Sequence, residues 1–137
     1  MRIYNYWIKF ADMKEQDKNI ELKDLGEFGL IERLTKKIKI FHENTKLGAG
    51  DDSAIIKSDK DILVSSDMLV EGIHFDMAFT PLKHLGYKSV IVNISDIYAM
   101  NATPKQITVS LAISSKYTLE AIEEFYDGIL LACEKYK

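Results

Sequence analysis

Cysteine is almost absent from this 137-residue chain, which contains only Cys133 and therefore cannot form an internal disulfide. That scarcity favours a reducing compartment, so we expect a cytoplasmic protein. No apolar stretch approaches the ~20 residues that cross a bilayer, and the opening residues lack the apolar core and cleavage site of an export signal. We therefore expect no membrane partner. The net charge of −3 gives no reason to expect a nucleic-acid partner either.

Several familiar binding motifs are missing as well. The chain has neither the Gly-x-x-x-x-Gly-Lys-Ser/Thr loop nor the Gly-x-Gly-x-x-Gly fingerprint, and it has no Cys/His cluster suited to zinc. Any handling of phosphate must therefore use other groups. The length is that of one ordinary domain, and 47% hydrophobic with 28% charged residues is normal for a globular protein.

Acidic residues are concentrated in one part of the chain. Residues 51–76 contain seven Asp or Glu and only two lysines. An acidic segment interrupted by apolar residues can be a solvated surface or a metal site, and the spacing of its carboxylates has to decide between the two.

Hydrophobic periodicity predicts a mixed α/β layer with helices on one face of a small sheet. Residues 1–24 show no clear period, and we treat them as an amino-terminal extension with little order. A break is expected at residues 101–104, and Thr118 is expected to cap the last helix. The expected elements are a helix at 27–41, a loop at 42–52, strands at 53–57 and 61–68, a helix at 81–100, a strand at 106–113 and a helix from 118 onward.

Four groups of residues could carry chemistry. Gly48-Ala-Gly-Asp-Asp52 combines a tight turn with two adjacent carboxylates, Asp51 and Asp52, and could also be a plain polar turn. Ser65, Ser66 and Asp67 follow an apolar strand, where α/β proteins often bind ligands, but the same residues suit a turn or a helix cap.

The other two groups lie further along the chain. Asn93 and Asp96 are three residues apart and share one face of an otherwise apolar helix. A buried carboxylate there would need a partner or a metal, whereas a face turned to solvent would need neither. The fourth group is His74 alone, and a lone histidine is more often a structural hydrogen-bonding residue than a catalyst. These residues indicate an α/β domain with a candidate carboxylate site for phosphate-bound magnesium, and they name no substrate.

Four motifs in order resemble the thiamine-monophosphate kinase family. The resemblance covers residues 25–137 and lies in Gly26-Glu-Phe-Gly-Leu-Ile31, Gly48-Ala-Gly-Asp-Asp-Ser-Ala54, Ser65-Ser-Asp-Met-Leu-Val-Glu-Gly-Ile-His-Phe75 and Gly86-Tyr-Lys-Ser-Val-Ile-Val-Asn-Ile-Ser-Asp-Ile-Tyr-Ala-Met100. It implies the fold of the aminoimidazole-ribotide-synthetase superfamily, whose amino-terminal α/β domain pairs with a second copy. It also implies transfer of the γ-phosphoryl group of ATP to thiamine monophosphate, which gives thiamine diphosphate.

The resemblance also implies roles for individual residues. Asp52, Ser65, Ser66, Asp67 and Asp96 match positions that hold several Mg²⁺ ions, and His74 matches the position that contacts the thiamine phosphate. Asp51 and Asn93 lie beside these positions with weaker support. No protein nucleophile is expected, because an oxygen of the acceptor phosphate can attack directly.

The sequence departs from the family pattern in three places and covers only part of it. Ser66 and Met68 stand where the family usually has Thr, and Asn101 stands where it usually has Gly. The family's Gly-Gly-Asp-Thr motif and its carboxy-terminal domain are expected beyond residue 137. We therefore expect residues 25–137 to be a truncated kinase domain that is inactive alone.

Two alternatives remain open at this point. One is another ATP-using member of the superfamily, of the selenophosphate synthetase, hydrogenase-maturation or purine synthetase type. The other is a non-catalytic module for dimerisation or nucleotide binding.

Overall fold

The computed structural model describes residues 22–48, 53–114 and 116–137. Their elements are, in order, α1 (Leu22–Thr35), β1 (Thr45–Leu47), β2 (Ile55–Ile56), α2 (Leu82–Ala99) and α3 (Leu119–Lys135). In this part of the chain the helices accompany a small antiparallel sheet made by β1 and β2, which confirms the predicted mixed α/β class. None of the helices within these ranges is long and apolar enough to cross a membrane.

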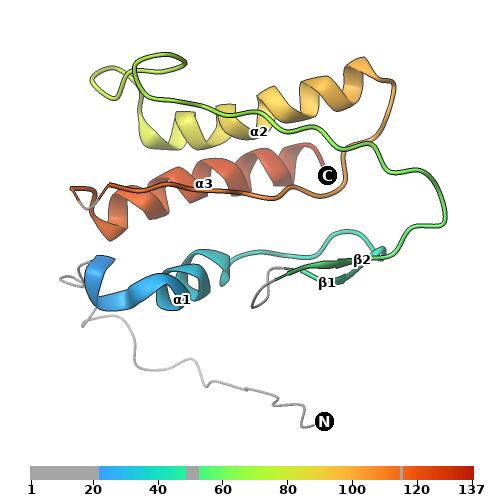
Figure 1. Cartoon of the computed structure of the whole chain (residues 1–137), viewed down its shortest axis with the longest axis horizontal. Coiled ribbons are helices and arrows are strands. Elements are labelled where there is room, and N and C mark those ends of the chain that lie inside the picture. Colours follow the sequence, from blue (N-terminus) through green and yellow to red (C-terminus); the bar gives the residue numbers. More distant parts are fainter. Residues whose placement is uncertain (1–21, 49–52, 115) are drawn as a thin grey trace, which may run out of the picture.

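The pair formed by α2 and α3 organises the described part of the chain. The two helices run in the same direction, and the segment that joins them runs back in the opposite direction (Figure 1). They touch backbone to backbone at two glycines. A Cβ placed on Gly86 would lie 1.9 Å from the carbonyl oxygen of Phe125, and one on Gly128 would lie 2.0 Å from that of Lys83. Only residues without a side chain allow so close a crossing.

The core lies along this crossing. Each large apolar side chain that is fully buried contributes about 1.5–3 kcal/mol, so the α2–α3 contact is the main source of stability among the described residues. The buried residues of the cluster are Leu85, Val90, Ile94, Phe125, Ile129 and Ala132. The start of α3 is fixed by Thr118, whose side chain accepts a hydrogen bond from the Ala121 amide, which confirms the predicted cap.

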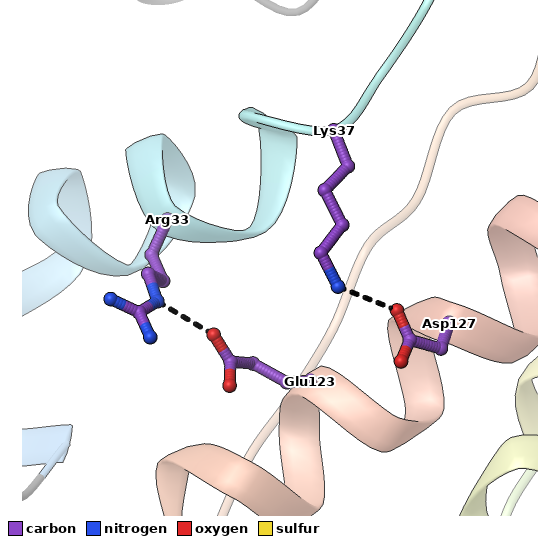
Figure 2. A network of polar contacts seen from close by, with 4 residues as sticks. All are labelled: Arg33, Lys37, Glu123 and Asp127. Carbon is purple, nitrogen blue, oxygen red and sulfur yellow. Dashed lines mark hydrogen bonds and ion pairs between the residues drawn. The ribbon is translucent and has the colours of Figure 1, made fainter. Parts of the chain in front are cut away.

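Helix α1 attaches to α3 through charged side chains. The Arg33 Nε lies 2.6 Å from the Glu123 carboxylate, and the Lys37 Nζ lies 2.9 Å from that of Asp127 (Figure 2). Arg33 and Lys37 are four residues apart, and so are Glu123 and Asp127. The two ion pairs are therefore neighbours on one side of the contact between the segments. Within α1, Gly26 has φ 65° and divides the helix into two parts, so that the second part begins where a helix from residue 27 was predicted.

Two local predictions for the first half of the chain were wrong. Helix α1 ends at Thr35 and does not continue to Phe41. Ile38, Ile40 and Phe41 remain exposed, so a longer helix would find no apolar surface to cover. The predicted loop at 42–52 contains β1, which pairs with β2 inside the predicted strand 53–57.

Two predicted strands do not form within the described residues. Residues 61–68 run alongside α2, and residues 106–113 cross α3 in the view of Figure 1, both without the backbone pairing of a sheet. A strand needs a partner for its N–H and C=O groups, and local sequence cannot supply one. The second segment is tied to β1 by a 3.0 Å hydrogen bond from the Gln106 side chain to the Thr45 hydroxyl.

Candidate functional site

Residues 65–75 lie along α2 and form three hydrogen bonds with its side chains. The Ser65 hydroxyl donates to Asp96 Oδ2 at 2.9 Å, and the Asp67 amide donates to Asn93 Oδ1 at 2.9 Å. Further along, the Lys88 ammonium donates to the His74 carbonyl at 2.7 Å. The partners on α2 appear in reverse order, so this segment runs antiparallel to the helix.

The first two contacts bring candidate metal ligands together from distant parts of the sequence. Asp96 is exposed at the surface, so the face it occupies is not a buried apolar one. Asn93 is half-buried and uses both ends of its amide, since its Nδ2 also donates to the Ser89 carbonyl at 2.9 Å. Asn93 is therefore a bridge between α2 and the 65–67 segment rather than a free ligand.

The third contact holds a compact turn. The amides of Ile73 and His74 donate to the Val70 carbonyl at 3.2 and 2.9 Å, and the Gly72 amide donates to the Phe75 carbonyl at 2.8 Å. Gly72 has φ 80°, a conformation that glycine adopts without strain. The exposed His74 side chain folds back, and its Nδ1 accepts a hydrogen bond from the Val70 amide at 3.0 Å.

The predicted site residues are thus only partly assembled here. Ser65, Asp67, Asn93 and Asp96 come together, Ser66 is exposed beside them, and His74 lies at the far end of the segment. Asp51 and Asp52 lie outside the described residues. Among the residues that are described, no three His, Cys, Asp or Glu side chains gather closely enough to hold a metal. The magnesium assignment stays a prediction.

The donor set fits magnesium by chemistry. The exposed carboxylates of Asp67 and Asp96 and the hydroxyls of Ser65 and Ser66 are hard oxygen donors, and Mg²⁺ in proteins prefers one or two carboxylates together with substrate oxygens. Because Ser65 engages only Oδ2 of Asp96, the other carboxylate oxygen remains available to a ligand.

Lys88 was missed by the sequence reasoning. It precedes Asp96 by eight residues on α2, which is about two turns of helix, so the two residues share a face. This spacing is the only feature of the sequence that could have pointed to Lys88. It identifies a shared face, but the contact with the His74 carbonyl depends on where the 70–75 turn comes to lie.

The pKa shifts in the described residues arise away from these contacts. Burial raises the pKa of the Cys133 thiol and of the Tyr126 hydroxyl. The hydrogen bond between the Tyr87 and Tyr136 hydroxyls, 3.4 Å long, lowers the pKa of Tyr87 and raises that of Tyr136. These groups line the α2–α3 contact, so they report on packing rather than on the candidate site.

Comparison with known proteins defines the class first. Residues 50–137 match the family model described as AIR synthase related protein, N-terminal domain. The match covers more than half of the chain and includes both the 65–75 segment and α2. The chain belongs to this family.

Individual proteins show which members of the family this chain is similar to. The thiamine-monophosphate kinase of Aquifex aeolicus is 37% identical over 119 residues, covering 86% of this chain and 37% of that protein. The thiamine-monophosphate kinase of Bacillus subtilis is 38% identical over 107 residues, covering 77% and 33%. That of Buchnera aphidicola subsp. Acyrthosiphon pisum is 44% identical over 112 residues, covering 80% and 34%. The chain therefore spans about a third of the length of these relatives, and no solved structure matches it.

Proposed function

We propose that this chain forms the amino-terminal, metal- and nucleotide-binding part of an ATP-dependent thiamine-monophosphate kinase, and that it acts as part of a longer protein in the cytoplasm. The observation that carries the proposal is the contact between the 65–67 segment and α2, which gathers oxygen donors from two distant parts of the sequence at the surface. The relatives are all named for this kinase and share this stretch.

The reaction asks the protein chiefly for positioning and for neutralisation of charge. The bond between the γ-phosphorus of ATP and its bridging oxygen breaks, and an oxygen of the thiamine monophosphate phosphate forms the new bond, which yields thiamine diphosphate and ADP. Magnesium bound here would neutralise the charge on the phosphates. In this proposal Asp52, Ser65, Ser66, Asp67 and Asp96 hold the metal, with Asp51 beside them.

The other residues bind and orient. His74 contacts the phosphate of the acceptor, and Asn93 keeps the Asp67 backbone in register with α2 through its 2.9 Å hydrogen bond. No side chain of the protein becomes covalently attached to the phosphoryl group. A second copy of the chain is the proposed partner, paired through the sheet region.

Asp→Asn variants of the full-length protein test the assignment. D67N and D96N each remove a carboxylate charge with little change in shape, and we expect turnover of thiamine monophosphate to fall by about a hundredfold or more, as when a group that stabilises developing charge is removed. D59N is the matched control, because Asp59 is an exposed residue of the same acidic segment outside the proposed ligands. Near-normal turnover in both ligand variants would refute the proposal.

Binding by this chain alone gives a second test. Calorimetric titration with a non-hydrolysable ATP analogue should show binding that requires Mg²⁺ and is weakened by D67N. Binding that is indifferent to Mg²⁺ and to D67N would contradict the metal assignment. In that case a non-catalytic nucleotide-binding module would be the better description.

A further inference from the structure

The hydrogen bond between Val70 and His74 fixes where the imidazole carries its proton. A backbone N–H can only donate, so Nδ1 of His74 must accept the 3.0 Å hydrogen bond from the Val70 amide. A ring nitrogen that accepts a hydrogen bond bears no proton. The neutral ring must therefore carry its proton on Nε2, the nitrogen on the opposite side of the ring.

The exposed position of His74 allows this tautomer to donate a hydrogen bond to a ligand. Its side chain lies at the surface rather than in the core, so the Nε2–H can serve as a donor to a ligand. An ionised phosphate oxygen can accept hydrogen bonds but cannot donate them, so it is complementary to the Nε2–H group. The opposite tautomer would present a lone pair to the phosphate and repel it.

The turn that creates this arrangement depends on an anchor. Between Asp67 and His74 the chain could extend about 23 Å, whereas their partners Asn93 and Lys88 are separated by about 7.5 Å of helix rise. The excess chain length is accommodated by the 70–75 turn, in which Glu71 forms an isolated bridge with Phe75. The ammonium group of Lys88, 2.7 Å from the His74 carbonyl, links this turn to α2 by a charge-assisted hydrogen bond.

We propose that Lys88 is a positioning residue, which holds the 70–75 turn so that His74 presents Nε2–H as a hydrogen-bond donor to the phosphate of the acceptor substrate. The identity of that substrate rests on the proposed function. The tautomer of His74 and the anchoring of the turn by Lys88 rest on contacts within the protein alone.

Nuclear magnetic resonance of this chain tests the arrangement without any activity. Two-bond ¹H–¹⁵N spectra distinguish the protonated from the unprotonated ring nitrogen, and the His74 signals are identified by their loss in H74Q. We expect the proton on Nε2 in the wild type, a mixture of tautomers in K88M, and recovery of the wild-type pattern in K88R, which keeps a charged donor. K83M is the matched control, because Lys83 is another exposed lysine of α2.

Kinetics of the full-length protein test the functional consequence. In K88M we expect the KM for thiamine monophosphate to rise about tenfold, the size expected for loss of a hydrogen bond to a charged group. The KM for ATP and kcat should change less than about twofold, and K88R should recover most of the loss. Such a split identifies positioning of the acceptor rather than a general loss of structure.

Several outcomes would overturn the inference. A proton on Nδ1 in the wild type would refute the donor assignment, and a wild-type tautomer in K88M would refute the role of Lys88. An unchanged KM, or an equal loss for both substrates, would do so as well. A wild-type protein that transfers no phosphate to thiamine monophosphate would instead refute the proposed function, and the spectra would still decide the arrangement of His74.

Discussion

At the scale of single residues, Asn101 shows how one backbone angle ends a helix. Its φ of 56° lies in the left-handed region, and its amide donates to the Tyr98 carbonyl at 2.9 Å while the Ala102 amide donates to the Ile97 carbonyl at 3.0 Å. These two hydrogen bonds form the Schellman motif, which satisfies the last carbonyls of α2. Asn tolerates this conformation better than most residues with a side chain.

Substitution of Asn101 should therefore depend on backbone preference rather than on polarity. N101V places a β-branched side chain in the left-handed region, and we expect it to lower the free energy of unfolding by about 1–2 kcal/mol. N101G removes the steric cost and should stay within about 0.5 kcal/mol of the wild type, since its more flexible unfolded chain offsets part of the gain. Urea denaturation of the chain measures both. Equal stability of the two variants would contradict this reading of Asn101.

The residues of the candidate site were predictable to the extent that their chemistry is local. Ser65 and Asp67 were singled out by their place after a predicted strand, Asp96 by its spacing from Asn93, and the family resemblance implied their metal role. The structure joins Ser65 to Asp96 and the Asp67 amide to Asn93, although the predicted strand does not form. Lys88 was not predictable, because its contact requires a turn whose position is set by tertiary packing. Asp51 and Asp52 lie outside the described residues, so their part in the site remains a prediction.

At the scale of elements, the close crossing of α2 and α3 gives the sharpest prediction. In G128A the new Cβ would lie 2.0 Å from the Lys83 carbonyl oxygen and 2.8 Å from the Tyr87 amide nitrogen. Neither backbone atom can move without separating the helices, so we expect a loss of about 3 kcal/mol or more in stability. Helix propensity alone predicts the opposite, a gain of up to about 1 kcal/mol for Gly→Ala.

Gly29 provides the matched control for this experiment. It also lies in a helix, but a Cβ there would meet only the Leu25 side chain at 3.4 Å, so G29A should be neutral or slightly stabilising. Thermal unfolding of both variants, followed by circular dichroism, gives the comparison. If G128A were as stable as G29A, the helices would not touch backbone to backbone.

The ion pairs between α1 and α3 should differ in strength because they differ in exposure. The Arg33 and Glu123 side chains are 26% and 30% exposed, whereas those of Lys37 and Asp127 are 64% and 45% exposed. Double-mutant cycles should give a coupling of about 1 kcal/mol for the first pair and about 0.3 kcal/mol for the second, both falling as salt rises. A stronger coupling for the Lys37 pair would contradict this dependence on exposure.

Helices α2 and α3 were predicted well because their signals are local, whereas elements that need distant partners were not. α2 and α3 follow apolar periodicity, a proline at the start of one helix and a threonine cap at the start of the other, all of which act within a few residues. Residues 61–68 and 106–113 have the composition of strands, but a strand also requires a neighbouring backbone. The described part of this chain provides that neighbour only for β1 and β2.

At the scale of the whole molecule, the two segments predicted as strands leave apolar side chains in solvent. Val64 is 81% and Met68 is 76% exposed, and Ile107, Val109 and Leu111 are exposed as well. Exposed apolar surface beside unpaired backbone is a template for association. A second copy of the chain presents the same surface, and two-fold pairing of identical surfaces is the commonest mode of assembly. The homodimer proposed above would cover these residues.

The mass of the chain in solution tests this assembly. We expect sedimentation equilibrium at micromolar concentration to give the mass of a dimer, and V64E to give that of a monomer with unchanged helix content, because a charge buried in the interface would lack a partner. F79E is the matched control, since Phe79 is 84% exposed but lies outside both segments, and it should leave the mass unchanged. A monomeric wild type would refute the dimer. A V64E variant that keeps the mass of a dimer would show that association does not use residues 61–68.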